Sequence, residues 1–187
     1  MLGIVALAIG LFVSLVTFQP ANTPARGSDC IIQGGPWKPD PVAGFTFDQV
    51  IKTEPIFEGE LNSVTTNCIS AKDAEFAPRV SSFGITIFNL SSQNAIVDIK
   101  KTLTSHIDDQ AIKQVSVKKQ NVNWFRNDSE KSVGFFWEEK LRFVYVEISG
   151  NIDDPSIASL KEKDLDIYME TLHTVGADVV NTILGGS

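Results

Sequence analysis

The longest uncharged apolar stretch of the sequence lies at its N-terminus and runs from Leu2 to Phe18. As a helix this stretch would be about 25 Å long, which is short for a bilayer core of about 30 Å. The length fits a signal peptide, although no Lys or Arg precedes Arg26 to form the usual basic segment. We therefore expect residues 1–19 to be either a signal peptide or a membrane anchor. A buried core helix is the third alternative, and it would need apolar partners on every face.

The rest of the chain divides into two parts by composition. Residues 20–43 contain five prolines and few apolar residues, which is typical of a linker. A turn at Gly34 and Gly35 can lay Trp37 on the domain that follows. Residues 44–187 have the length of one ordinary domain, so the sequence predicts a single extracytoplasmic domain there.

Only two cysteines occur in the sequence, Cys30 and Cys68. An even number of cysteines in an exported chain favours a disulfide. In the chain-entropy model, closing a loop of this size stabilises a fold by about 4 kcal/mol. Two buried free thiols are the alternative. No metal site is predicted, because neither His106 nor His173 lies near a cysteine in the sequence.

The charge balance restricts the class of partner. The 23 acidic residues outnumber the 16 Lys and Arg residues and give a formal net charge of -7. A surface of this sign repels phosphate backbones, so we expect no nucleic acid among the partners. The hydrophobic fraction of 43% is enough to build a core, which argues against disorder for most of the chain.

Two stretches with apolar residues every three or four positions predict helices. The first is expected to begin after Ser91 or Ser92 and to end near His106. The second is expected to begin at Lys161 or Asp164 and to reach Leu184.

The strongest strand signal is a hairpin over residues 132–149, whose second strand we expect at the centre of the sheet. Further strands are expected near residues 45–47, 56–57, 64–69, 79–89, 112–117 and 122–125. This order predicts an α+β fold. It is expected to be an antiparallel sheet with two main helices packed on one face, preceded by the N-terminal apolar helix and the Pro/Gly-rich linker.

Large aromatic residues gather in and around the predicted hairpin. Core packing is the simplest explanation, but their number also suggests an exposed sheet face that docks a partner or a sugar. Under that second interpretation the candidate binding residues are Trp124, Phe136, Trp137 and Tyr145.

No arrangement of residues points to catalysis or to a cofactor. Neither histidine accompanies a nucleophile motif such as G-x-S-x-G. Glu138 and Glu139 are neighbours at a predicted hairpin tip, so their side chains point to opposite sides. Asn151, Asp153 and Asp154 lack the full ligand spacing of a calcium loop, and turn chemistry explains them better. We predict no catalytic residue, no metal and no cofactor.

Three functions remain open from the sequence. The first is an exported or membrane-tethered domain with a non-enzymatic binding or structural role, whose partner is a protein or a cell-surface component. The second is a small exported hydrolase or ligand-binding protein whose site combines scattered residues, such as His173 with an acid. The third is a subunit of a membrane complex. If residues 2–18 are not cleaved, the membrane itself is a further partner.

Overall fold

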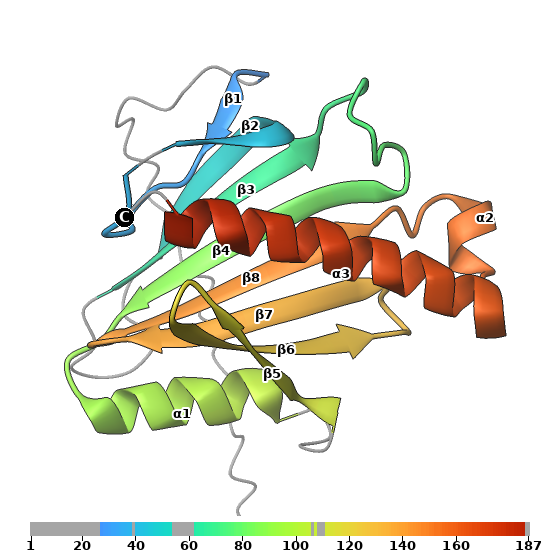
Figure 1. Ribbon diagram of the computed structural model, residues 1–187. Helices are drawn as coiled ribbons and strands as arrows, with labels where there is room; N and C mark the ends of the chain where they lie inside the picture. Colours follow the sequence, from blue (N-terminus) through green and yellow to red (C-terminus); the bar gives the residue numbers. More distant parts are fainter. Residues whose placement is uncertain (1–26, 39, 54–61, 106, 108–110, 186–187) are drawn as a thin grey trace, which may run out of the picture.

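The computed structural model describes residues 27–185, apart from 39, 54–61, 106 and 108–110. The N-terminal apolar run therefore lies outside the described residues. Eight strands form one sheet in the order β1-β2-β3-β4-β8-β7-β6-β5, and every neighbouring pair is antiparallel (Figure 1). The strands are β1 (Asp29–Ile31), β2 (Pro41–Thr53), β3 (Asn62–Ser70), β4 (Val80–Asn89), β5 (Lys113–Val117), β6 (Gln120–Asn127), β7 (Ser132–Glu139) and β8 (Arg142–Gly150).

The two central strands are β4 and β8, which confirms the central position predicted for the second strand of the hairpin. Side chains on a strand alternate between its two faces, and both strands carry apolar residues on the face that the C-terminal helix covers. On that face Ile85 pairs with Val146, and both side chains are buried. On the other face Phe88 pairs with Phe143, so the middle of the sheet has apolar surface on both sides.

The helices do not share one face of the sheet. Helix α3 (Glu162–Gly185) packs with the core cluster that contains Ile85 and Val146, which defines the α3 face. Helix α1 (Gln93–Thr104) packs through Ile96 and Ile99 with the cluster that contains Phe88 and Phe143, which defines the α1 face. The predicted fold, with two main helices packed on one face, is therefore wrong. The described part of the protein is a single eight-stranded antiparallel sheet with its C-terminal helix on one face.

The physical reason for this error lies in the strand alternation. Phe143 and Val144 are consecutive residues of β8 and point to opposite faces, and both are fully buried. Each face must therefore be covered, which a single helical layer cannot do. The short apolar stripe of α1 covers one end of its face, whereas the stripe of α3 extends along the other face.

Local signals place the helix ends where the sequence predicts them. Ser92 caps α1, because its hydroxyl accepts a hydrogen bond from the Ala95 N–H at 3.2 Å. The short helix α2 (Pro155–Ala158) is capped by Asp154 in the same way.

At the start of α3, the Arg126 guanidinium of β6 reaches Asp166 at 2.9 Å and Asp128. Burial of Tyr168 and its hydrogen bond to the Arg79 carbonyl, at 2.6 Å, attach α3 to the start of β4.

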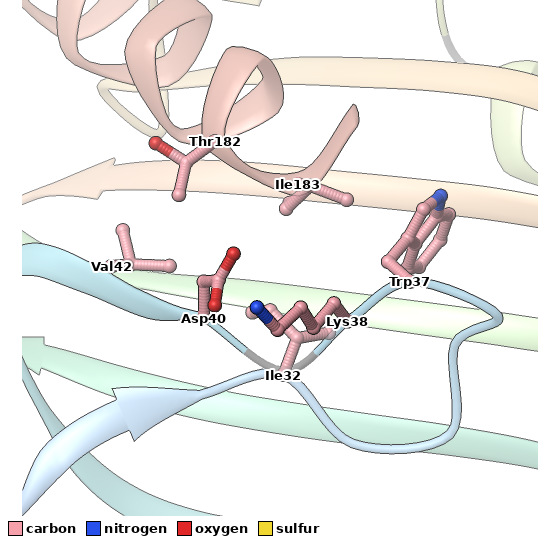
Figure 2. Close-up of a pocket in the computed structure, with 7 residues that line it drawn as sticks. All are labelled: Ile32, Trp37, Lys38, Asp40, Val42, Thr182 and Ile183. Carbon is pink, nitrogen blue, oxygen red and sulfur yellow. The ribbon is translucent and has the colours of Figure 1, made fainter. Parts of the chain in front are cut away.

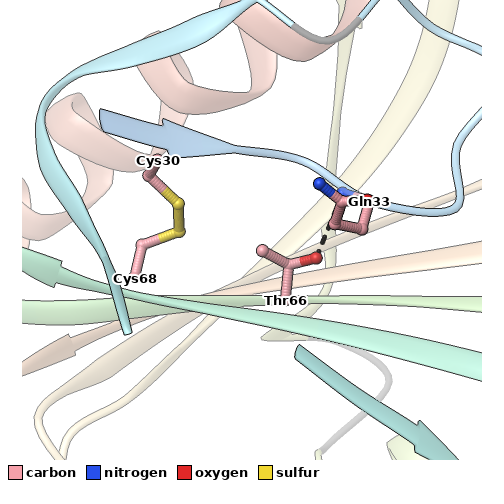
Figure 3. The surroundings of a disulfide bond; sticks show 4 residues. All are labelled: Cys30, Gln33, Thr66 and Cys68. Carbon is pink, nitrogen blue, oxygen red and sulfur yellow. Dashed lines mark hydrogen bonds between the residues drawn. A yellow bond between two sulfur atoms is a disulfide. The ribbon is translucent and has the colours of Figure 1, made fainter. Parts of the chain in front are cut away.

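The segment after residue 28 folds over the sheet and forms an N-terminal arm (residues 29–38). Cys30 of β1 is joined by a disulfide to Cys68 of β3, and both are fully buried (Figure 3). These strands are not neighbours, since β2 pairs with both. The pairing predicted from the cysteine count is confirmed.

The arm then follows β3 across the α3 face. The Gln33 N–H donates to the Thr66 hydroxyl at 3.1 Å (Figure 3). A side chain at Gly34, which has a φ of 80°, would come within 3.0 Å of Val64. The turn that follows brings Trp37 against Trp137, with 5.9 Å between ring centroids. Trp37 therefore packs on the domain, as the sequence predicts.

The domain boundaries 1–19, 20–43 and 44–187 remain predictions. Within the segment predicted as a linker, β1 belongs to the sheet and Trp37 is only 9% exposed. Among the described residues, none of the helices has the length and apolar character needed to span a bilayer.

Candidate functional site

The four aromatic residues singled out in the sequence do not form one exposed surface. Phe136 and Trp137 are each 1% exposed, and they point to opposite faces of β7. Trp124 joins Trp137 on the α3 face, whereas Tyr145 joins Phe136 on the α1 face. The structure thus divides the set between two cores, and only Trp124 and Tyr145 are partly accessible.

Tyr145 lies at the rim of the α1 cluster. Its hydroxyl donates to Glu147 at 3.2 Å, and its ring stacks on Phe125. Burial of the phenol, followed by the nearby negative charge of Glu147, raises the pKa of Tyr145. The group therefore stays protonated and serves as a hydrogen-bond donor in the physiological range.

His173 lies between two aromatic rings of the α3 face. Its ring centroid is 4.1 Å from that of Trp124 and 5.6 Å from that of Phe135. Burial lowers the pKa of His173, while the charge of Glu170 opposes that shift. The structure thus surrounds this histidine mainly with apolar ring surface.

The other candidate residues from the sequence form ion pairs or helix caps, are partly buried, or lie outside the described residues. Glu138 pairs with Lys100 of α1 at 3.5 Å, while Glu139 is half-buried. The Asp154 carboxylate accepts hydrogen bonds from Ser156, which lower its pKa. His106 falls among the residues that are not described. Within the described residues, no group of three or more His, Cys, Asp or Glu side chains could hold a metal ion.

A groove runs along one side of α3 at the surface. It consists of three adjoining hollows with cavity volumes of about 770, 350 and 10 Å³. Neighbouring hollows share lining residues: Glu75, Phe76, Val175 and Asp178 line the first two, and Val42 and Thr182 the last two. We call this continuous feature the α3 groove.

One wall of the groove is a single face of α3. Its residues recur every three or four positions, which is the spacing of one helical face. They are Ile167, Glu170, Thr171, Thr174, Val175, Asp178, Val179, Thr182 and Ile183. This face adjoins the buried stripe, so its inner residues, such as Val179, belong to the core and its outer residues, such as Asp178, reach solvent.

The opposite wall is formed by residues 74–79, in the connection between β3 and β4, and by the beginning of β2. The Ala71 N–H donates to the Gly44 carbonyl at 2.9 Å, and the loop continues as a series of hydrogen-bonded turns up to Arg79. The Phe76 ring stacks on Phe45 at 4.9 Å and lies over Gly44, where a Cβ atom would meet it at 2.7 Å. Because this wall is held at Gly44, Phe45 and Tyr168, the groove is preformed.

The floor of the groove is apolar and its rim is acidic. Phe45 and Val179 are buried in the floor, and Phe76 and Val175 are partly exposed. Three carboxylates line the two larger hollows, namely Glu75, Glu170 and Asp178, and the cation Arg79 lines the largest one. Among the described residues, these three carboxylates take part in no salt bridge. The two larger hollows therefore carry a net negative charge.

The narrow end of the groove lies where the arm meets the last turn of α3. Figure 2 shows Thr182 and Ile183 of α3 facing Val42 and Asp40, with Lys38 and Trp37 of the arm beside them. This end holds one carboxylate and one ammonium group, so its charges balance. The disulfide holds the arm against β3 and thereby fixes this end of the groove.

The groove was not predicted from the sequence, because its residues are common types in ordinary positions. Its walls come from the arm, the β3–β4 connection and α3, which are far apart in the chain. One signal in the sequence is the recurrence of Thr beside the buried stripe of α3, at positions 171, 174 and 182.

Comparisons of the chain with protein-family models, with curated proteins and with solved structures give no significant match.

Proposed function

We propose that the protein is an exported or membrane-tethered extracytoplasmic domain with a non-enzymatic role, and that it binds a protein or cell-surface component through the α3 groove. The observation that carries this proposal is the continuous, preformed groove with an apolar floor and an acidic rim. Binding sites usually combine concave apolar surface with a few polar groups that fix orientation. The buried disulfide supports an oxidising, extracytoplasmic environment.

The residues that line the groove support binding more than catalysis. No His or Cys is among them. A threonine hydroxyl becomes a nucleophile only beside a general base. Here each of the three threonine hydroxyls donates to the backbone carbonyl four residues earlier: Thr171 to Ile167, Thr174 to Glu170 and Thr182 to Asp178.

The proposed binding surface differs from the aromatic sheet face expected from the sequence. Phe136 and Trp137 fill the cores on the two sides of β7, and a partner would have to unfold the hairpin to touch them. The groove needs no such change. We therefore keep the proposed binding role and place it at the groove.

A site-specific cross-linking experiment tests the role of the groove. A photo-reactive amino acid replaces Thr174 at the rim in the full chain, within the cells that produce the protein. The matched control carries the same group in place of Asp98, which is exposed on α1 at the other face of the sheet. We expect one recurrent adduct from position 174 and none from position 98. Equal adducts at both positions, or none at 174, would contradict a binding groove.

The proposed location has its own test. The mass of the protein isolated from its source shows whether the mature chain retains residues 1–19. A chain that begins after Phe18 supports export with cleavage of a signal peptide, whereas a chain that retains the run and sediments with membranes supports tethering. A full-length chain in the cytosolic fraction would contradict both forms of the proposal.

A further inference from the structure

We propose that the α3 groove binds an extended peptide segment of a partner protein that carries two Lys or Arg side chains four residues apart, with an apolar side chain midway between them. The inference rests on the proposed function of the groove and identifies the chemistry of its occupant. Three observations carry it: the spacing of two carboxylates on α3, the apolar side chains between them, and the sign of the charge in the groove.

The spacing follows from helix geometry. Glu170 and Asp178 both line the groove and are eight residues apart in one helix, which separates them by about 12 Å at 1.5 Å per residue. In an extended chain, residues on the same side recur every second position, and residues four positions apart are separated by about 13 Å. Two cationic side chains at that spacing can therefore each meet one carboxylate while the peptide backbone stays straight.

The surface between the two carboxylates combines apolar side chains with Thr171 and Thr174, whose hydroxyls donate to backbone carbonyls of α3. Val175 and Phe76 line both of the larger hollows, from opposite walls, and both side chains are partly exposed. A side chain midway between the two cations points to the same side of an extended peptide and lies over this surface. An apolar residue there removes water from Val175 and Phe76, whereas a charged residue loses its hydration without gaining a partner.

The length of the groove fits a short extended segment. In the two larger hollows the helical wall runs from Ile167 to Thr182, which is about 22 Å along α3. About seven residues of an extended chain cover that distance. A peptide of this length spans these two hollows, whereas the narrow end, with a volume of about 10 Å³, is too small for a peptide residue.

The charge of the groove selects against other occupants. Glu75, Glu170 and Asp178 face a single cation, Arg79, in the two larger hollows. A second copy of this chain carries a net charge of -7 and would bring like charge to the rim. A nucleic acid or an anionic lipid surface is repelled for the same reason. A basic peptide is the occupant whose charge is complementary.

The test uses fluorescein-labelled eight-residue peptides and measures fluorescence anisotropy with the full chain. The basic probe carries lysines at its third and seventh positions, valine at its fifth and serines elsewhere. A rearranged probe of the same composition carries the lysines at adjacent positions, and an acidic probe carries glutamates in place of the lysines. The groove variant is a double charge reversal, Glu170→Lys with Asp178→Lys. The matched control is also a double charge reversal, Asp98→Lys with Asp153→Lys, at two exposed positions outside the groove.

We expect the basic probe to bind about tenfold more tightly than the acidic probe, and the rearranged probe to bind several-fold more weakly than the basic probe. Replacement of Glu170 and Asp178 by lysine should weaken binding of the basic probe about tenfold. The salt dependence of the remaining binding should then come only from the other charges of the protein. The control double variant should keep at least half of the wild-type affinity, because its charges lie away from the groove.

Three outcomes would contradict the inference, each for a different reason. If the acidic probe binds as well as the basic one and a Thr174→Trp substitution at the rim weakens both, the groove binds peptides and the proposed basic occupant is wrong. If no probe binds, while the cross-linking experiment gives its rim-specific adduct, the groove binds an occupant other than an extended basic peptide. If the control substitutions Asp98→Lys and Asp153→Lys weaken binding of the basic probe as much as the groove substitutions do, the attraction is non-specific. That result would overturn the inference.

Discussion

The β7–β8 hairpin and the α3 groove are opposite in composition and in accessibility. The hairpin carries large aromatic residues, and Phe135, Phe136, Trp137 and Phe143 are each almost completely buried. The α3 wall of the groove consists mainly of Thr, Val and acidic side chains, and its rim is open to solvent. In this protein the large aromatic residues of the hairpin build the core. The proposed binding surface is formed by common residue types that the fold brings together.

The difference should appear first in stability. Trp137→Ala removes the largest fully buried side chain and should lower the free energy of unfolding by about 3–5 kcal/mol, because it leaves a cavity beside Trp37. Urea denaturation followed by circular dichroism measures this change. Trp137→Phe should cost less, since it keeps most of the volume and removes an indole N–H that has no partner among the described residues. A loss below about 1 kcal/mol for the alanine variant would show that the hairpin is not the core assumed here.

The disulfide should have the next largest effect. Replacement of Cys30 and Cys68 by alanine should lower the free energy of unfolding by about 2–4 kcal/mol, because the unfolded chain regains the freedom of the closed loop. The same urea titration applies, with reduced wild-type protein as the control. If the oxidised and reduced wild-type proteins have equal stability, the arm does not depend on this bond.

His173 should make stability depend on pH below the neutral range. Its burial lowers the pKa in the folded state below the ordinary value of 6.5, so the unfolded chain binds the proton more readily. The contribution to stability is therefore complete above pH 6.5 and decreases as the pH falls below that value. Denaturation curves at pH 7.5, 6.5 and 5.5 for the wild type and His173→Gln measure it. The variant should lose this part of the pH dependence, and identical pH slopes for both proteins would contradict it.

The groove variants should have the smallest effect on stability and the largest on binding. Glu170 and Asp178 are exposed and form no salt bridge among the described residues, so their reversal to lysine should change the free energy of unfolding by no more than about 0.5 kcal/mol. Thermal unfolding of the double variant beside Asp98→Lys with Asp153→Lys measures the difference. A loss above about 2 kcal/mol would mean that the groove residues hold the fold, as the hairpin residues do.

The sequence predicted most single elements because their signals are local. The Ser92 cap, the hairpin over 132–149 and the apolar stripe of α3 each need only neighbouring residues to be recognised. The pairing of Cys30 with Cys68 followed from the count alone. These signals state which elements form and leave open how they are stacked.

The arrangement of the helices and the groove depend on contacts that are distant in the chain. Apolar residues on both faces of β8 indicated two covered faces, yet the pattern of α1 gave no sign of which face it covers. The groove arises where Tyr168 holds Arg79 and where the Phe76 ring fits over Gly44. Each of these contacts joins segments that are separated by β-strands, so no window of the sequence contains it.

A single titration tests the central claim that the groove, and not the aromatic hairpin, is the binding surface. The full chain is labelled with ¹⁵N and titrated with the basic eight-residue probe, and the backbone amide shifts are followed by NMR. We expect the largest shifts on the groove face of α3, between Ile167 and Thr182, and on residues 74–79. Shifts centred on the partly accessible aromatic residues Trp124 of β6 or Tyr145 of β8 would contradict the proposed binding surface.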